Sequence, residues 1–306
     1  MTVYIIKRLL ALIPVLIGVS LIIFGIMQLI PGDAAEVMVG TNGSAADVER
    51  IRETLGLNKP IYEQYWLFIS RAAVGNFGRS TQTGRPALTE FSSRVKPTAE
   101  LAAAALILAI FFGMLTGIVS AILQYSVWDY LVTVVSLIGV SAPIFWTGLM
   151  MMLLFSVWLG WLPATGSGSF SRLIMPALAL GSASTAIIAR QMRSGLLEVL
   201  RQDYVRTARA KGLREWTVIA RHAVRNALIP TVTVVGLQFG YLLGGSVLTE
   251  TVFARPGVGS FLVNSIQARD IPVVQATIML LAVAFLVVNL LVDLLYAVLD
   301  PRIRYS

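Results

Sequence analysis

The stretch LLALIPVLIGVSLIIFGIMQLI occupies residues 9–30 and contains no charged side chain. A helix needs about 20 apolar residues to cross the hydrocarbon core of a bilayer, so this stretch predicts a membrane-spanning helix. Lys7 and Arg8 precede it, as basic residues precede the apolar region of a signal peptide. The apolar run is too long for a signal peptide and no small-residue cleavage site follows it, so we expect a retained helix.

Composition places the rest of the chain in the same class. Of the 306 residues, 57% are hydrophobic and 13% are charged, whereas about a quarter of a typical soluble domain is charged. Unpaired backbone groups are costly in lipid, so the other apolar blocks should also be helices. These blocks are Leu101–Leu123, Leu131–Leu159, Leu173–Ala189, Ala227–Leu248 and Val273–Leu299. The predicted fold class is an all-α polytopic membrane protein with six transmembrane helices. The sequence has no cysteine, which excludes disulfides and thiolate metal sites.

Basic residues predict the orientation of these spans. Between Arg190 and Arg225 the chain carries nine Lys or Arg residues, whereas the loops 160–172 and 249–272 carry one and two. Short loops rich in Lys and Arg stay in the cytoplasm. We therefore expect both termini and the basic loop to be cytoplasmic, and residues 31–94 to lie outside. This topological role also explains the pI near 10.0 without a nucleic-acid partner.

The outer segment is expected to be helical. SAADVERIRETLGL, residues 44–57, has the spacing of a capping box at Ser44 and Asp47, and Gly56 can end the helix. IYEQYWLFISRA, residues 61–72, repeats the apolar spacing of an amphipathic helix. Two interpretations remain open, namely a lid on the membrane domain and a contact with an external partner.

The basic segment DYVRTARAKGLREWTVIARHAVRN occupies residues 203–226. We expect a short helix that begins with Asp203 as its N-cap and ends at Gly212. A second helix should follow, with one apolar face made by Trp216, Ile219, Ala220, Ala223 and Ala227. Positive charge that only sets topology does not require this arrangement. A helix–glycine–helix with small residues such as Ala208 and Ala210 can dock into a groove of another protein.

Several motifs resemble one protein family. They are LIPGD (29–33), FGRS (77–80), RTARAKGL (206–213), RHAVRNALIP (221–230), RPGVGSFLVNSIQARDIPVVQA (255–276) and LVDLLYAVLDPRIRY (291–305). Together they resemble the permeases of binding-protein-dependent ABC importers, in the dipeptide, oligopeptide and nickel branch. The general signature of the family is EAA, then three residues, then Gly. Ala208 and Gly212 match it, but Arg206 and Thr207 stand at its first two positions. TARAKG is typical of the peptide branch, and GLQFGYLLGGSV (236–247) is most like its glutathione importers.

The resemblance implies a type I ABC importer permease fold in the bacterial inner membrane. It implies an N-terminal span (1–30), an extracytoplasmic helical segment (31–94), a transmembrane domain (95–295) with a coupling loop (190–226), and a cytoplasmic tail (296–306). The residues expected to couple to the ATPase are Arg206, Thr207, Ala208, Arg209, Ala210, Lys211, Gly212 and Leu213.

The resemblance also implies partners and a substrate. The partners are a second homologous permease, two cytoplasmic ABC ATPases that bind ATP-Mg, and an extracytoplasmic substrate-binding protein. The sequence contains no G-x-x-x-x-G-K-[ST] phosphate loop, so we expect this chain to be neither the ATPase nor an enzyme, and to hold no cofactor. The implied substrates are dipeptides or oligopeptides, glutathione among them. A nickel or metal-chelate importer of the same branch is the alternative.

Polar and small residues inside the spans remain to be assigned. Gly236, Gly240 and Gly244 recur every four residues, and such glycines permit close helix packing or line a path or a permease interface. Gln238 lies among them and is a candidate polar group of the translocation path.

Ionisable residues give little support to other classes of site. His222 has no carboxylate or second histidine at metal-ligand spacing, so we expect an interfacial or ATPase-contacting role. Ion-coupled carriers place carboxylates in mid-membrane, but within the expected spans only Asp293 is acidic, and it lies near a span end. An ion-coupled secondary transporter is therefore disfavoured.

Overall fold

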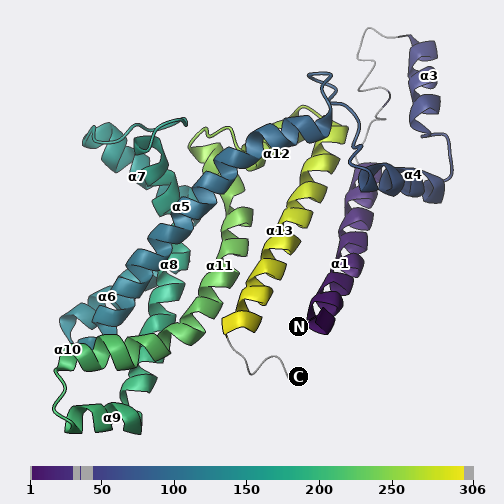
Figure 1. The fold of residues 1–306 in the computed structure, drawn as a ribbon. Coiled ribbons are helices and arrows are strands. Elements are labelled where there is room, and N and C mark those ends of the chain that lie inside the picture. The colour runs from purple at the N-terminus through teal and green to yellow at the C-terminus, as the bar shows by residue number, and fades with distance from the viewer. Residues whose placement is uncertain (1, 30–34, 36–43, 300–306) are drawn as a thin grey trace. The chain divides into compact units, whose positions relative to one another are not determined.

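The computed structural model describes residues 2–29, 35 and 44–299, and its regular elements over these residues are all helical (Figure 1). Five helices are long and apolar enough to cross a membrane, and a bent pair supplies a sixth candidate span. The expected all-α membrane fold is therefore confirmed. The chain divides into two compact units, Met1–Lys96 with Gly257–Leu290, and Pro97–Pro256 with Leu291–Ser306.

The first unit combines the N-terminal part of the chain with a segment close to its C-terminal end. Its elements are α1 (Thr2–Leu29), α3 (Ala45–Leu55), α4 (Ile61–Ala73), the first turns of α5 (Ala87–Ile122), α12 (Val258–Gln267) and most of α13 (Ile271–Leu299). The expected capping box begins α3, where the Ser44 hydroxyl accepts a hydrogen bond from the amide of Asp47 and the Asp47 carboxylate accepts one from the amide of Ser44. Gly56 ends α3 in the left-handed conformation, with φ +76°.

Two motifs that lie about 190 residues apart in sequence meet in the first unit. The Ser80 hydroxyl donates a 2.5 Å hydrogen bond to the Asp270 carboxylate, and the Thr81 amide donates one of 3.1 Å to the same group. Asp270 and Ser80 are both buried. FGRS and RDIP therefore form one polar joint, which ties the chain before α5 to the start of α13.

The second unit is built around α8 (Ser171–Leu200). Its other elements are the rest of α5, α6 (Val127–Ser141), α7 (Ile144–Met151), the π-helix η1 (Met152–Trp158), α9 (Asp203–Ala210), α10 (Glu215–Thr217), the π-helix η2 (Val218–Val224) and α11 (Arg225–Val252). Helix α8 packs against α6, α7 and α11 and buries residues along most of its length.

Glycines bring α5 and α8 unusually close. A Cβ atom at Gly117 would lie 2.5 Å from the carbonyl oxygen of Ala189, and one at Gly113 would lie 2.8 Å from that of Thr185. Gly181 on α8 makes the reciprocal approach, 2.8 Å from the carbonyl oxygen of Ala105. Small residues at such positions let helix backbones touch in a membrane. Gly113 and Gly117 therefore serve the close packing of α5 on α8.

The third expected span is wrong as a single helix. We expected Leu131–Leu159, but α6 ends at Ser141 and the following α7–η1 segment bends away by 110°. Pro143 causes the break, because it has no amide to continue the helix and it forces the preceding residue out of the helical region. Ala142 accordingly has an extended backbone, with φ −74° and ψ 129°.

The fourth span was placed too short. We expected it to end at Ala189, but α8 continues to Leu200, so Arg190 and Arg193 belong to a helix and not to a loop. The expected basic loop therefore begins about ten residues later than 190. The other expected spans are confirmed as α1, α5, α11 and α13, although α5 begins at Ala87 and not at the predicted Leu101. The expected cytoplasmic tail, residues 296–306, lies outside the described residues from position 300 onward.

Candidate functional site

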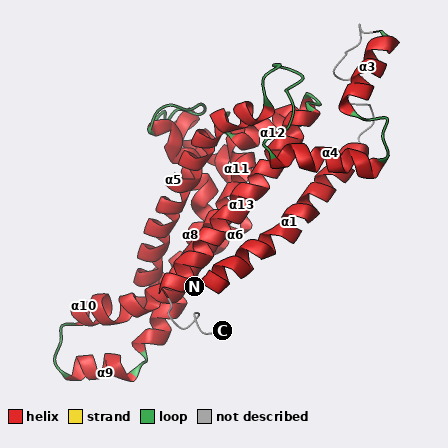
Figure 2. Cartoon of the chain, turned by 45° about the vertical axis from the view of Figure 1, so that its right-hand side comes forward, coloured by secondary structure: helices red, strands yellow, loops and turns green. Residues whose placement is uncertain are grey.

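Helix α9 and the turn after it form the candidate site (Figure 2). The helix begins after Gln202, whose backbone is extended with ψ 149°, so the expected N-cap at Asp203 is wrong by one residue. Asp203 lies in the first turn, where a carboxylate is favoured by the helix dipole. Gly212 ends the turn with φ +75°, a conformation that costs little only without a Cβ, and its predicted role as the helix stop is confirmed.

The inner face of α9 packs on the chain itself. Val205 and Ala208 are buried and contact Val218 of η2, with Val199 and Leu200 of α8 beside them. Ala208 was expected to shape a contact with a partner, but its methyl group fills this internal cluster. The spacing of three residues between Val205 and Ala208 places both on one helical face.

Two polar contacts brace the turn. The Arg209 guanidinium donates two hydrogen bonds to the Glu215 carboxylate, at 2.6 and 3.1 Å, across the turn that contains Gly212. The same contact raises the pKa of Arg209, because its charged form donates to a carboxylate. The amide of Asn226 donates a 2.8 Å hydrogen bond to the Tyr204 hydroxyl. An exposed ion pair stabilises by only about 0–1 kcal/mol, so its main effect here is to fix the direction of the helix.

The outer face, which is formed by α9 and the turn after it, is exposed. Its exposed residues are Arg206, Thr207, Ala210, Lys211, Gly212 and Leu213. They are the residues predicted to couple to an ATPase, except that Ala208 faces inward and Arg209 is tied to Glu215. The structure therefore presents a small, basic, rigidly held surface at one end of the second unit (Figures 1 and 2).

The helix that follows the turn differs from the expected one. It runs without interruption from Glu215 into α11, and Ile219, Ala223 and Ala227 are buried as predicted. Trp216 and Ala220 were assigned to the same face but are exposed. The π-helical turn η2 explains the difference, because it closes its hydrogen bonds one residue later than an α-helix and rotates the faces on either side.

An ion pair that the sequence did not indicate anchors α8 above this region. Arg193 donates to both oxygens of Asp129 at 2.8 Å and to the Ser120 hydroxyl at 3.0 Å, which joins α8, α6 and α5. The Asp129 side chain is only 4% exposed, against 30% for Arg193. Arg193 was counted as a loop charge, so the pair was missed. The available signal was the spacing of Ser126 and Asp129, which is that of a helix cap.

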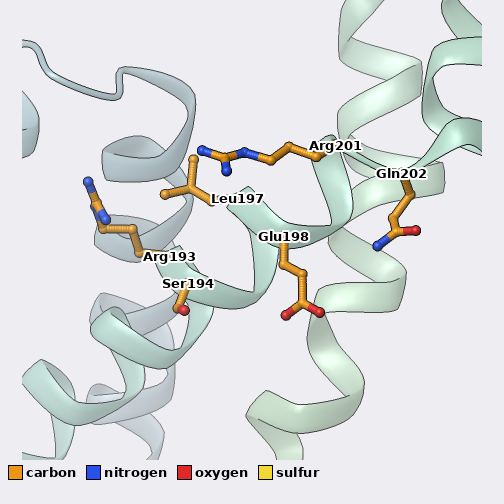
Figure 3. A pocket seen from close by; sticks show the side chains of 6 residues that line it. All are labelled: Arg193, Ser194, Leu197, Glu198, Arg201 and Gln202. Carbon is orange, nitrogen blue, oxygen red and sulfur yellow. The ribbon is translucent and has the colours of Figure 1, made fainter.

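A hollow lies on α8 between this anchor and α9 (Figure 3). Its volume is about 430 Å³, and it is lined by Arg193, Ser194, Leu197, Glu198, Arg201 and Gln202. Figure 3 shows the Arg201 side chain extending past Leu197 toward the side of Arg193, while Glu198 points away from both. Gln202 is also the N-cap of α9, so the hollow reaches the start of the candidate site.

The residues predicted for the translocation path lie on α11. The Gln238 side chain accepts a 2.9 Å hydrogen bond from the Ser184 hydroxyl of α8, and Gly240 is buried. Gly244 is exposed, and a Cβ atom there would meet nothing within 4 Å. The three predicted glycines therefore do not share one environment, and Gln238 joins two helices in this structure.

The last expectations from the sequence concern His222 and metal binding. His222 is half-buried on η2, where its carbonyl oxygen accepts a hydrogen bond from the Asn226 side chain. Within the described parts of the chain, no three His, Cys, Asp or Glu side chains are grouped so that they could hold a metal ion.

Matches to known proteins cover nearly the whole chain. Residues 94–305 match the family described as "Binding-protein-dependent transport system inner membrane component", and residues 1–97 match the corresponding N-terminal family. The chain is 45% identical over 303 residues to the glutathione transport system permease protein GsiC of Escherichia coli (strain K12), with 99% of each chain covered. The same protein of Shigella dysenteriae serotype 1 (strain Sd197) gives the same figures.

Solved structures share the fold. An amino acid ABC transporter determined with histidines superimposes with a TM-score of 0.51 at 17% identity, covering 68% of this chain and 94% of that one. The methionine ABC transporter MetNI in inward-facing conformations gives a TM-score of 0.53 at 18% identity, covering 67% and 95%. At these identities the likeness concerns the fold alone.

Proposed function

Because the chain belongs to the family of binding-protein-dependent transport system inner membrane components, we propose that it is the membrane-spanning permease subunit of an ATP-driven importer of short peptides. The observation that carries the proposal is the 45% identity over 99% of both chains to a glutathione permease. Glutathione and related dipeptides or oligopeptides are the proposed substrates, and a nickel chelate is the alternative within the same branch.

The assembly proposed for transport has four kinds of component. This chain pairs with a second, homologous permease, two ATPase subunits bind and hydrolyse ATP-Mg, and a binding protein delivers the substrate on the other side of the membrane. The ATPases are the source of the free energy, since the chain has no phosphate-binding loop. In this assembly α9 and both termini are cytoplasmic.

The proposed mechanism relies on the rigid mounting of α9. Its inner face is packed through Val205 and Ala208, and the Arg209–Glu215 pair fixes its turn. In the sequence α9 lies between α8 and α11. A motion applied to the outer face of α9 is therefore passed to both of these helices. The Ser184–Gln238 hydrogen bond joins those two helices further along, so we assign Gln238 to the seam that rearranges as the path opens.

Transport by a reconstituted complex tests the function. The chain, its partner subunits and their binding protein are placed in vesicles with ATP inside or outside as orientation requires, and uptake of labelled glutathione, a dipeptide and a nickel chelate is compared. ATP-dependent uptake of glutathione or the dipeptide supports the proposal. Uptake of the nickel chelate alone would assign the chain to the metal-chelate importers.

Cysteine labelling tests the orientation, because the natural chain has no cysteine. Gln82 and Lys211 are both exposed and lie in the segments assigned to opposite sides of the membrane. In sealed cells an impermeant thiol reagent should label Gln82→Cys and should not label Lys211→Cys. The reverse pattern would place α9 outside and would exclude its contact with a cytoplasmic ATPase.

A further inference from the structure

Helix α4 lies across the end of α1 within the first unit (Figures 1 and 2). Four contacts hold it there. The ring of Phe24 on α1 meets the rings of Tyr65 and Phe68 at 5.5 and 6.2 Å between centroids. The hydroxyl groups of Tyr65 and Ser20 are hydrogen-bonded at 2.8 Å, and the side-chain amides of Gln28 and Gln64 at 3.0 Å.

These contacts fix the depth of α4 in the membrane. The apolar run of α1 starts at Leu9, and about 20 residues at 1.5 Å each fill the 30 Å hydrocarbon core, which then ends near Gln28. Phe24 lies about 6 Å before that level, because four helical residues rise about 6 Å. Helices that lie in a membrane interface place their apolar face about 5–10 Å into the boundary between headgroups and acyl chains. The contacts of α4 with α1 fall at this depth.

A second apolar face of α4 is exposed in the part of the chain that the structure describes. Tyr62 and Trp66 lie one turn apart and are 71% and 69% exposed, with Ile69 and Ala73 next along the same face. This face is separate from the one that carries Tyr65 and Phe68. Its opposite side carries polar residues, among them the exposed Arg71. The helix is thus apolar on two adjoining faces, one that meets α1 and one that is open.

We propose that α4 is an interfacial helix whose open face, Tyr62, Trp66 and Ile69, lies in the lipid of the leaflet that α1 reaches at Leu29. The occupant is lipid because α4 is held against a candidate membrane span, and Ile22 and Ile26 of that span, in the same turns as Phe24, are themselves 63% and 51% exposed. Tyr and Trp are also the side chains that favour the headgroup level, since each has an apolar ring and a polar group.

This assignment resolves the two interpretations that the sequence left open for the outer segment. Helix α4 serves neither as a lid nor as the receptor contact, but anchors the end of α1 at a fixed depth. The Tyr65–Ser20 hydrogen bond supports this, because a hydroxyl pair in hydrocarbon satisfies both groups without water. The proposal depends on membrane insertion of α1 and not on what the protein transports.

Spin-label accessibility tests the proposal in the intact complex. Single cysteines replace Trp66 or, as the control on the polar side of the same helix, the exposed Arg71. The complex is reconstituted in vesicles of phosphatidylethanolamine and phosphatidylglycerol and labelled with a nitroxide. Collision rates are then measured with oxygen, which concentrates in hydrocarbon, and with a water-soluble nickel chelate.

We expect oxygen to collide faster than the nickel chelate at Trp66→Cys, and the order to be reversed at Arg71→Cys. If Trp66→Cys lowers the yield of folded protein, Tyr62→Cys one turn earlier must give the same order. Faster collision with the nickel chelate at position 66 would show a water-exposed face and overturn the proposal. Protection from both reagents there would show that a protein covers the face, which overturns it equally.

Discussion

Removal of Arg193 should destabilise the protein more than neutralisation of its partner Asp129. The two side chains are joined by two hydrogen bonds of 2.8 Å, and Ser120 contributes a third contact. Arg193→Met leaves a carboxylate that is 4% exposed without its counter-charge. Asp129→Asn instead leaves a guanidinium that is 30% exposed and can still be hydrated. The burial of the two partners therefore predicts an asymmetric effect.

The magnitude follows from that asymmetry. Loss of one partner from a buried ion pair costs about 3–5 kcal/mol, and the partial exposure of Arg193 places Arg193→Met near the lower end, at about 3 kcal/mol. Asp129→Asn loses hydrogen bonds to a charged group that water partly replaces, which costs about 1.5 kcal/mol. In the double variant the buried charge and its partner are both gone, so its cost should fall below that of Arg193→Met alone.

The assay is reversible unfolding of the purified chain in mixed micelles, followed by tryptophan fluorescence as the denaturing detergent is increased. The free energy of unfolding is compared for the natural protein, the two single variants and the double variant. Equal costs for the two single variants, or a double variant whose cost equals their sum, would refute the argument. Additivity would mean that the two side chains act independently.

Two further predictions concern packing and the polar joint of the first unit. Gly117→Leu should lower the free energy of unfolding by about 1–3 kcal/mol because its Cβ has no room against α8, whereas Gly244→Leu should change it by less than about 0.5 kcal/mol. Equal effects in the same micelle assay would contradict the close approach of α5 and α8. Ser80→Ala removes a hydrogen bond to the buried Asp270 carboxylate and should cost about 1.5–3 kcal/mol, while Ser70→Ala, at an exposed hydroxyl, should cost much less. A neutral Ser80→Ala would show that the joint contributes no stability.

The parts of the fold that the sequence predicted are those set by local composition. Four spans follow from long runs of apolar residues, and Ser44 and Gly56 mark the ends of α3 because capping depends on neighbouring residues. Gly212 is predictable for the same reason, since a left-handed residue ends a helix and glycine adopts that conformation most easily.

The parts that were missed depend on contacts between distant residues. The length of α8 could not be read from hydropathy, because Arg193 is tolerated in the helix only through Asp129, which lies 64 positions earlier. The exposure of Trp216 depends on a π-helical turn that no spacing rule indicates. The inward position of Ala208 depends on Val218, so the sequence alone did not show that this small residue packs inside the chain.

The bend after α6 is an intermediate case. Pro143 was visible in the sequence and is a known helix breaker, but the hydrophobic run continues on both sides of it. We predicted one span from hydropathy, whereas the backbone chemistry of proline favours two helices. The structure contains two helices that meet at Pro143.

The central claim is that the outer face of α9 binds a cytoplasmic ATPase, and substitution at Ala210 tests it most directly. Ala210 is exposed on that face, whereas Ser169 is exposed in the loop before α8. The measurement is the amount of ATPase that co-purifies with the chain for Ala210→Trp, Ala210→Ser and Ser169→Trp, with membrane yield as the control for folding. We predict that Ala210→Trp loses most of the ATPase at normal membrane yield, and that the other two variants retain it. Retention of the ATPase by Ala210→Trp at the natural level would contradict the docking of an ATPase on α9.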